Sequence, residues 1–268
     1  MPLAVCATPI GNLDDVTLRV LEELRAADVV LCEDTRHTRV LLVRHEISAR
    51  LLSYHEHNEA KRTAELLPRL RQGERMALVS DAGLPGVSDP GARLVAAARE
   101  AGVPVTVLPG ASAVQTALVA SGLAAERYQF IGFLPRAGKA LAALWGELAT
   151  WPHPLVAFES PRRLPATLRS LAEAQPAREV VVCRELTKRF EEVVRGTAEE
   201  LAARFAQPPK GEITLVLGPG AEAGGAGGGA ALEAVGELVA AGLPRRRAAD
   251  VVSRLTGVSR NELYRRTL

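Results

Sequence analysis

Short apolar runs alternate with amphipathic stretches through the first part of the chain. The runs are rich in Val, Leu and Ala and predict buried strands, and the stretches between them repeat apolar residues at helical spacing. The expected strands are 3–7, 29–32, 51–54, 76–79 and 103–108, and the expected helices include 15–26 and 58–72. Such alternation of strands and helices predicts a doubly wound, largely parallel α/β sheet.

The pattern changes after Tyr128, where more closely spaced runs predict a second α/β domain with mixed or antiparallel pairing. The expected elements are strands at 128–133, 155–159, 179–183, 192–196 and 213–217, with helices at 139–150 and from about Pro161. A Gly/Ala-rich stretch then lacks the large side chains that pack. We therefore expect an N-terminal α/β domain at 1–124, a second α/β domain at 125–219, a Gly/Ala linker at 220–230 and a helical basic tail at 231–268 with helices at 231–242, 245–255 and 261–268.

Composition narrows the class of protein only slightly. The net charge of +2 over 268 residues gives no overall signature of nucleic-acid binding. The tail is different, because residues 231–268 hold seven Arg against four acidic residues, which indicates either an anionic partner or a solvated helical face.

Cysteine usage and hydropathy indicate where the chain resides. Cys6, Cys32 and Cys183 are odd in number, follow no C-x-x-C spacing and sit in or beside apolar runs, so we expect buried reduced thiols in a cytoplasmic protein. No signal-peptide pattern and no apolar run of about 18 residues is present, so neither secretion nor a membrane span is expected.

Glycine-rich loops follow two of the expected strands. The loop after 76–79 holds Gly83 and Gly91 beside Asp81 and Asp89, and the run VTVLPGASAVQTALVASG repeats the order strand, glycine loop and helix. Glycine lets a ligand approach the backbone at the carboxyl end of a strand, so two such loops predict one crevice for a small extended cofactor. Neither G-x-G-x-x-G nor a P-loop motif is present, which disfavours a dinucleotide or nucleoside-triphosphate site.

A polar cluster, CEDTRHT, lies just past the strand at 29–32. Asp34 could accept a proton or orient a substrate hydroxyl, while Arg36 and Arg39 could hold a phosphate. The alternative is that Asp34 or Thr35 only caps a helix.

A second polar cluster, SYHEHNE, contains His55 and His57. In a strand the two rings would point the same way and could bind a metal, but no convincing third ligand accompanies them. Hydrogen bonding, nucleic-acid contact or the lining of a crevice are the preferred interpretations, and we expect no metal.

Several segments, taken together, resemble one family. ATPIGNLDDVTLR, CEDTRHT, SYHEHNE, VSDAGLPGVSDPG, LPGASA, GFLPR, FESPRRL, CRELTK and KGEITLV occur in the order expected for the tetrapyrrole-methylase superfamily of S-adenosylmethionine-dependent enzymes. They resemble more closely its ribosomal RNA small-subunit methyltransferase I branch, the cytidine 2′-O-methyltransferases. The resemblance covers roughly residues 3–219, and the tail is similar to the helical C-terminal extension of that branch.

The resemblance implies two α/β domains with S-adenosylmethionine in a cleft between them, and a homodimer. It also implies methylation of a cytidine ribose 2′-hydroxyl in the decoding region of small-subunit (16S) rRNA, either as free RNA or in the 30S subunit. The cofactor contacts that it implies are Pro9, Asp81, Gly83, Leu84, Ser112, Ala113, Leu134, Glu185, Thr187, Gly211, Glu212 and Ile213.

A ribose hydroxyl is a poor nucleophile at neutral pH, so a base or hydrogen-bond acceptor should assist the methyl transfer. Our hypothesis for the catalytic group is Asp34, helped by Arg36 and Glu33. Asp81 is less suitable because its loop suits the cofactor, and Glu185 and Lys188 are second choices. The expected RNA contacts are Arg136, Lys139, Arg162, Arg163, Lys188, Arg245, Arg246 and Arg247.

One departure from the branch lies after GFLPR, where its members usually continue with Lys. This chain reads Arg136-Ala137-Gly138-Lys139, so Lys139 is the candidate replacement. Other interpretations are a methyltransferase of small tetrapyrroles, a ribosome-binding protein without catalysis, and a dinucleotide-dependent oxidoreductase. The basic tail disfavours the first, and the missing G-x-G-x-x-G disfavours the last.

Overall fold

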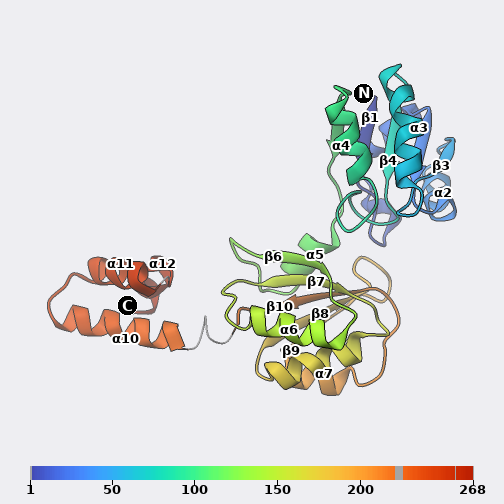
Figure 1. The fold of residues 1–268 in the computed structure, drawn as a ribbon. Coiled ribbons are helices and arrows are strands. Elements are labelled where there is room, and N and C mark those ends of the chain that lie inside the picture. The colour runs from blue at the N-terminus through green and yellow to red at the C-terminus, as the bar shows by residue number, and fades with distance from the viewer. Residues whose placement is uncertain (1, 221–225, 257, 268) are drawn as a thin grey trace. The chain divides into compact units, whose positions relative to one another are not determined.

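The structure is a computed structural model that describes residues 2–220, 226–256 and 258–267, and it divides into two compact units (Figure 1). Unit 1 comprises Met1–Ala120 and Cys183–Glu192, and unit 2 comprises Ser121–Val182 and Val193–Leu268. The short segment Cys183–Glu192 thus groups with unit 1 although its place in the sequence put it in the expected domain at 125–219. The domain boundaries given above stay a prediction.

Unit 1 contains the predicted parallel sheet, with the strand order β3-β2-β4-β1-β5. Its strands are β1 (Leu3–Cys6), β2 (Val29–Cys32), β3 (Leu51–Ser53), β4 (Met76–Val79) and β5 (Val105–Leu108). β1 pairs in parallel with β4 and β5, and β2 pairs in parallel with β3 and β4, which confirms the predicted parallel sheet. Its helices are η1 (Leu13–Asp15), α1 (Leu18–Ala26), α2 (Thr35–Arg44), α3 (Glu59–Arg71), α4 (Ala92–Glu100) and α5 (Ala113–Ala120).

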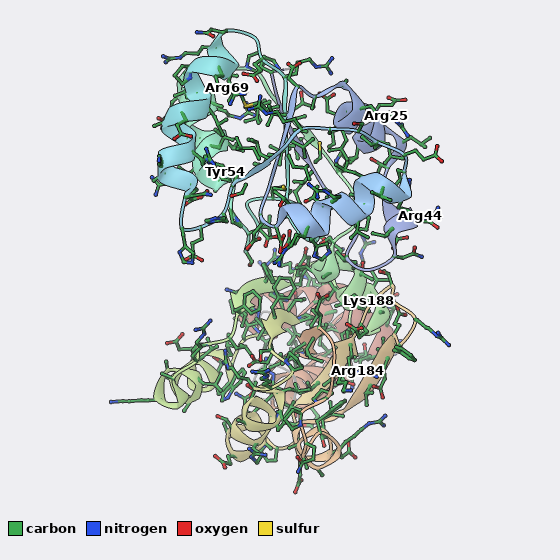
Figure 2. The ribbon with its side chains drawn as sticks, turned by 90° about the vertical axis from the view of Figure 1, so that its right-hand side faces the viewer. Arg25, Arg44, Tyr54, Arg69, Arg184 and Lys188 are labelled. Atoms are coloured by element: carbon green, nitrogen blue, oxygen red, sulfur yellow. The ribbon has the colours of Figure 1, made fainter. Side chains whose placement is uncertain are left out.

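Helices cover both faces of this sheet because the strands are apolar on both sides. Ala4 and Cys6 pack into one core cluster with α1 and α2, whereas Leu3 and Val5 pack into another with α3 and α4. Tyr54 follows β3 and is buried against α3, where its hydroxyl lies 3.0 Å from Thr63 Oγ1 (Figure 2). Alternate residues of each strand therefore serve opposite cores, as expected for a doubly wound sheet.

Unit 2 contains a mixed sheet with the strand order β6-β7-β10-β8-β9. Its strands are β6 (Gln129–Phe133), β7 (Leu155–Glu159), β8 (Glu179–Arg184), β9 (Glu192–Thr197) and β10 (Ile213–Leu217), and its helices are α6 (Gly138–Leu148), α7 (Leu164–Ala174) and α8 (Ala198–Arg204). β6 pairs with β7 in parallel and β10 pairs with β7 antiparallel, which confirms the predicted mixed pairing.

The C-terminal tail forms the three expected helices, α10 (Ala226–Ala240), α11 (Arg245–Thr256) and α12 (Arg260–Arg266). They share a small apolar cluster of their own that includes Val235, Val252 and Leu263. α10 begins at Ala226, within the stretch expected to be a linker, although the glycines at 227–229 are poor helix formers. The other part of that linker prediction, residues 221–225, lies outside the described residues. No described helix is long and apolar enough to cross a membrane.

Cys6, Cys32 and Cys183 are buried free thiols, as expected. Burial raises the pKa of both Cys6 and Cys183 to about 12. Because the thiolate is the reactive form, these two groups are chemically inert at neutral pH.

Candidate functional site

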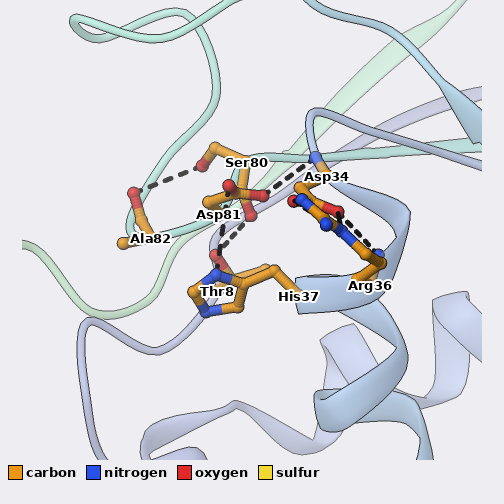
Figure 3. Close-up of polar contacts among 7 residues, drawn as sticks. All are labelled: Thr8, Asp34, Arg36, His37, Ser80, Asp81 and Ala82. Carbon is orange, nitrogen blue, oxygen red and sulfur yellow. Dashed lines mark hydrogen bonds and ion pairs between the residues drawn. The ribbon is translucent and has the colours of Figure 1, made fainter.

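The loops that follow β1 and β4 join at the carboxyl edge of the unit 1 sheet. The Thr8 N–H donates to the Gly83 carbonyl at 2.8 Å, and the Gly83 N–H donates back to the Thr8 carbonyl at 3.0 Å. The Thr8 hydroxyl also donates to the Ser80 carbonyl at 3.0 Å (Figure 3). Gly83 has a φ of +80°, a conformation that other residues rarely adopt. These bonds hold together the two loops that carry Pro9 and Asp81, both expected at the cofactor.

The loop after β5 approaches the same edge closely. A Cβ built on Gly110 would lie 2.9 Å from the Ala7 Cβ, so only glycine fits at this approach. The loop leads into α5, where the Ser112 carbonyl accepts from the Thr116 N–H at 3.0 Å. Ser112 and Ala113 are therefore carried at the edge that also holds Pro9 and Gly83.

A turn at Glu185–Lys188 docks on the first glycine loop from far along the chain. The Asn12 N–H donates to Thr187 Oγ1 at 3.0 Å, and a Cβ on Gly11 would lie 2.5 Å from Lys188 Cγ. Glu185 and Thr187 have φ values of +53° and +65°, which are strained for residues other than glycine. The surrounding contacts hold this strain, which is typical of functional sites.

Lys188, expected to contact RNA, is instead half-buried in this turn. Its Nζ lies 3.0 Å from Glu185 Oε1 in an ion pair. This ion pair stabilises the turn, and the RNA contact expected of Lys188 stays a prediction.

A pocket of about 430 Å³ opens beside the loops, at the carboxyl ends of β2, β3 and β4. Its lining comes from both polar clusters of the sequence and from the β4 loop: Glu33, Asp34, Thr35, Arg36, Ser53, His55, Glu56, His57 and Asp81. The expectation that His55 and His57 line a crevice is therefore confirmed. A volume of this size suits a small-molecule group or a single nucleoside.

The two histidines do not form the side-by-side pair that a strand would give. They follow β3 in a turn, with ring centroids 5.9 Å apart and planes at 70°. Within the part of the chain that the structure describes, no group of three or more His, Cys, Asp or Glu side chains is arranged to hold a metal ion.

Asp34 caps α2, the helix that the sequence analysis offered as the alternative for CEDTRHT. Its Oδ1 accepts from the Arg36 N–H at 2.8 Å, and its Oδ2 pairs with Arg36 NH2 at 2.7 Å (Figure 3). The backbone N–H of Asp34 donates to Asp81 Oδ1 at 3.1 Å, which ties α2 to the β4 loop. The hydrogen bonds from Arg36 lower the pKa of the Asp34 carboxyl, so it is a good hydrogen-bond acceptor and a weak base.

Glu33 has the opposite electrostatics. Burial, and next the charge of Asp81, raise the pKa of its carboxyl. The Glu33 side chain lines the pocket and accepts no hydrogen bond from another described residue. A partly buried carboxyl with a raised pKa is suited to take up a proton at neutral pH.

Asp89, in the loop after β4, lies close enough to the pocket residues Glu33 and Asp81 to feel their charges, and its sequence position alone suggested no role. Burial raises the pKa of its carboxyl to about 7, with further contributions from the charges of Glu33 and Asp81. The available sequence signal was that acidic residues follow two strands, β2 and β4, which become neighbours in the sheet.

Asp89→Asn should remove a pH dependence of stability. Because the folded pKa lies above the unfolded value of 3.8, the folded state retains the proton, and stability falls as pH rises from about 4 to 7. The variant lacks this penalty, so we expect it to gain about 1–2 kcal/mol at pH 8 relative to pH 4, after allowing for solvent screening. Thermal melts at both pH values measure this gain, with exposed Asp15→Asn as the control. Equal pH slopes for wild type and Asp89→Asn would contradict it.

In unit 2 the expected cofactor residues differ in how far they are buried. Leu134 belongs to the core of the unit at 2% exposure, and its N–H donates to the Phe158 carbonyl at 3.2 Å. Gly211 has a φ of +94° just before β10, Glu212 is exposed, and Ile213 is the first residue of β10 and is buried. The cleft that the resemblance implies stays a prediction.

The residues expected to contact RNA differ in their exposure and in whether they form ion pairs within the protein. Arg136, Lys139 and Arg162 are exposed, whereas Arg163 pairs with buried Glu159. The tail cations Arg245, Arg246 and Arg247 occupy the first turn of α11. Positive charge opposes the helix dipole at that end, and a bound anion would relieve the repulsion.

Comparison with known proteins shows the family. The family description "Tetrapyrrole (Corrin/Porphyrin) Methylases" matches residues 2–202, and "RsmI C-terminal HTH domain" matches residues 226–268. A protein of Mesorhizobium japonicum named ribosomal RNA small subunit methyltransferase I is 47% identical, covering 99% of this chain and 91% of its own length. A protein of Micromonospora olivasterospora with the same name is 46% identical, covering 98% of this chain and 85% of its own length.

Solved structures of the same fold include uroporphyrin-III-C-methyltransferase from Thermus thermophilus. That structure is 25% identical with a TM-score of 0.56, and the match covers 84% of this chain and 97% of the other. The methyltransferase CobJ has a TM-score of 0.62 at 21% identity, covering 82% of this chain and 94% of the other. The chain thus belongs to the tetrapyrrole methylase family and, within it, groups with the ribosomal RNA small subunit methyltransferase I proteins.

Proposed function

We propose that this protein transfers a methyl group from S-adenosylmethionine to the ribose 2′-hydroxyl of a cytidine in the decoding region of small-subunit (16S) rRNA. The observation that carries the proposal is the pocket, which lies in the same unit as the glycine-lined loops expected to hold the cofactor. The names of the relatives, at 46–47% identity over nearly the whole chain, favour an RNA substrate over a small tetrapyrrole.

The loops of unit 1 fit an extended cofactor. Gly83 has a φ of +80° and a Cβ there would be in ordinary contact with the Ala111 carbonyl oxygen at 3.8 Å, so the backbone conformation rather than lack of space favours glycine in this loop. S-adenosylmethionine supplies a methyl group on a positively charged sulfur. The residues proposed to hold it are Pro9, Asp81, Gly83, Leu84, Ser112, Ala113, Glu185 and Thr187 in unit 1, and Leu134, Gly211, Glu212 and Ile213 in unit 2.

Two carboxyl groups of the pocket, Asp34 and Glu33, have different roles at the ribose hydroxyl. Asp34 is held by Arg36 and by the start of α2, and it accepts a hydrogen bond from the 2′-hydroxyl. This hydrogen bond would orient the hydroxyl oxygen for its attack on the methyl carbon. The hydroxyl has one proton, which would pass from its hydrogen bond with Asp34 to Glu33 as the O–C bond forms and the bond from the methyl carbon to sulfur breaks, since the raised pKa of Glu33 suits it to hold that proton. The sequence-based hypothesis placed both functions mainly on Asp34, and the contrast between the two carboxyls motivates the division.

The test uses tritiated S-adenosylmethionine with three acceptors in parallel: unmodified small subunits, deproteinised rRNA and a tetrapyrrole precursor. We expect label on the RNA, retained in an alkali-resistant dinucleotide because a 2′-O-methyl group blocks cleavage at that ribose. Label on the tetrapyrrole alone would overturn the proposal. Comparing subunits with free rRNA identifies the form of the substrate.

The helical tail is proposed as an RNA contact through Arg245, Arg246 and Arg247. Deleting residues 231–268 should weaken binding of the substrate RNA and flatten its salt dependence, by about 0.7–0.9 in log–log slope for each phosphate that the tail no longer neutralises. Titrations across a salt series measure this, and unchanged affinity for S-adenosylmethionine is the control. A variant that binds RNA like wild type at every salt concentration would remove the tail from the proposal.

The homodimer and the cytoplasmic location implied by the resemblance are part of the same proposal. An enzyme that methylates rRNA must reach the ribosome or its precursors, which supports the location. Light scattering of the purified chain tests the dimer.

A further inference from the structure

An exposed aromatic ring ends strand β6 of unit 2. Phe133 is 63% exposed, although its ring packs edge-on against Phe158 with centroids 5.4 Å apart. Phe158 also contacts Phe130, with centroids 5.0 Å apart, so the Phe133 ring packs against a side chain that is itself held by another ring. A large apolar side chain that is supported from one side and open to solvent is suited to stacking.

Three basic residues lie at the same edge of the unit 2 sheet as this ring. Arg136 and Lys139 follow it along the chain, and Arg162 follows β7. Because β6 and β7 run parallel, their carboxyl ends lie at the same edge of the sheet, which brings Arg162 to this edge as well. All three side chains are exposed, and none forms an ion pair with another described residue.

Arg163 braces the backbone beneath these residues. Its NH1 and NH2 both donate to the Leu134 carbonyl at 3.1 Å, and NH2 also donates to the Pro135 carbonyl. The same guanidinium lies 3.3 Å from Glu159 Oε2, whose side chain is fully buried. The planar fork of arginine thus ties β7 to the segment that carries Phe133 and Arg136, which an ammonium could not do in the same geometry.

We propose that this edge of unit 2 is a platform for a single-stranded part of the substrate RNA, with Phe133 stacked on a base. Arg136, Lys139 and Arg162 contact phosphates, and Arg163 is a positioning residue that fixes the ring and the cations relative to one another. This inference rests on the proposed function. An aromatic ring among cations is the usual composition of single-strand sites, because every base has a stacking face and every nucleotide a phosphate.

The test measures binding of a single-stranded RNA of the decoding-region sequence to the full chain, together with copies in which one nucleotide at a time is abasic. Phe133→Leu should weaken binding by about 5- to 150-fold, and Phe133→Tyr should restore it. The abasic change at the stacked nucleotide should weaken wild type but not Phe133→Leu. Tyr128→Leu, just before the other end of β6, is the matched control.

The salt dependence separates the ring from the cations. Phe133→Leu should keep the wild-type salt slope, whereas Arg136→Gln should lower it by about 0.7. Arg163→Lys keeps the charge and removes the fork, so it should raise the KM for RNA with kcat little changed. Arg169→Lys on the exposed face of α7 should do neither.

The platform is overturned if Phe133→Leu binds RNA like wild type, or if its loss of affinity is equal at every abasic position. It is also overturned if the variant instead changes the oligomeric state or the affinity for S-adenosylmethionine, because Phe133 would then face a second copy or the cofactor. If wild type neither binds nor methylates RNA, the proposed function itself fails. If wild type methylates RNA and Phe133→Leu is unaffected, only the platform fails.

Discussion

Glu33→Gln should lower kcat for methyl transfer by about 10²–10⁴-fold, with the affinity for S-adenosylmethionine unchanged. Glutamine keeps the size of the side chain but cannot take the proton of the ribose hydroxyl. Since burial and Asp81 raise the pKa of Glu33, wild-type kcat should increase with pH as this carboxyl ionises, and the variant should lack that rise. Single-turnover rates across a pH series, with cofactor binding measured by calorimetry, provide both quantities.

Two matched variants give this prediction its specificity. Glu100→Gln on the exposed face of α4 should leave the rate unchanged. Asp34→Asn still allows a cap on α2 but releases Arg36, so methylation should be abolished with cofactor affinity retained. Near-normal turnover in Glu33→Gln would exclude Glu33 as the base, and near-normal turnover in Asp34→Asn would exclude Asp34 from the site.

The sheets were largely predictable because their strands are buried and sharply bounded. The predicted strands at 76–79, 155–159 and 213–217 match β4, β7 and β10 residue for residue. Each is a short, mostly apolar run that is almost entirely buried, so position and burial coincide.

Helix starts were less predictable because side-chain caps decide them. The predicted helix at 15–26 begins at Leu18, because the Thr17 side chain accepts from the Val20 N–H and a short 3-10 turn precedes it. α7 begins at Leu164 rather than near Pro161, because the intervening residues form a turn. Periodicity marks the apolar face of a helix, whereas its first residue depends on which side chain reaches the backbone.

The candidate site was predictable where its parts follow neighbouring parallel strands. CEDTRHT follows β2 and SYHEHNE follows β3, and strand order alone brings them to one pocket. The internal role of Arg163 was not predictable, because its partners Leu134 and Pro135 lie in the loop after β6 and accept through backbone carbonyls. Sequence gives the charge of such a residue but not the group that neutralises or binds it.

The docking of the turn at Glu185–Lys188 could not be predicted from the sequence either, since Asn12 and Thr187 lie 175 residues apart. Only the structure shows why Gly11 is glycine. The turn occupies the space that a side chain at position 11 would need. A Cβ there would lie 2.7 Å from Thr187 Oγ1 and 2.9 Å from the Leu186 carbonyl oxygen.

Gly11→Ala should therefore displace the turn and lower kcat/KM by about 10²-fold, because Glu185 and Thr187 are proposed to hold the cofactor. The clash should also destabilise the fold by about 1–3 kcal/mol. Calorimetric affinity for S-adenosylmethionine and urea unfolding measure the two effects. Gly146→Ala is the control, because a Cβ at this exposed position in α6 meets nothing within 4 Å, and it should stabilise by about 0.5–1 kcal/mol.

A second substitution shows which atoms obstruct the added methyl group. In the double variant Gly11→Ala, Lys188→Ala the clash with Lys188 Cγ is gone, while those with Thr187 and the Leu186 backbone remain. Cofactor affinity should thus recover only in part. Full recovery would mean that the Lys188 side chain was the whole obstacle, and wild-type affinity in Gly11→Ala alone would mean that the turn does not hold the cofactor. Partial recovery is expected because backbone atoms, unlike the end of a lysine, have nowhere to move without releasing the strained turn.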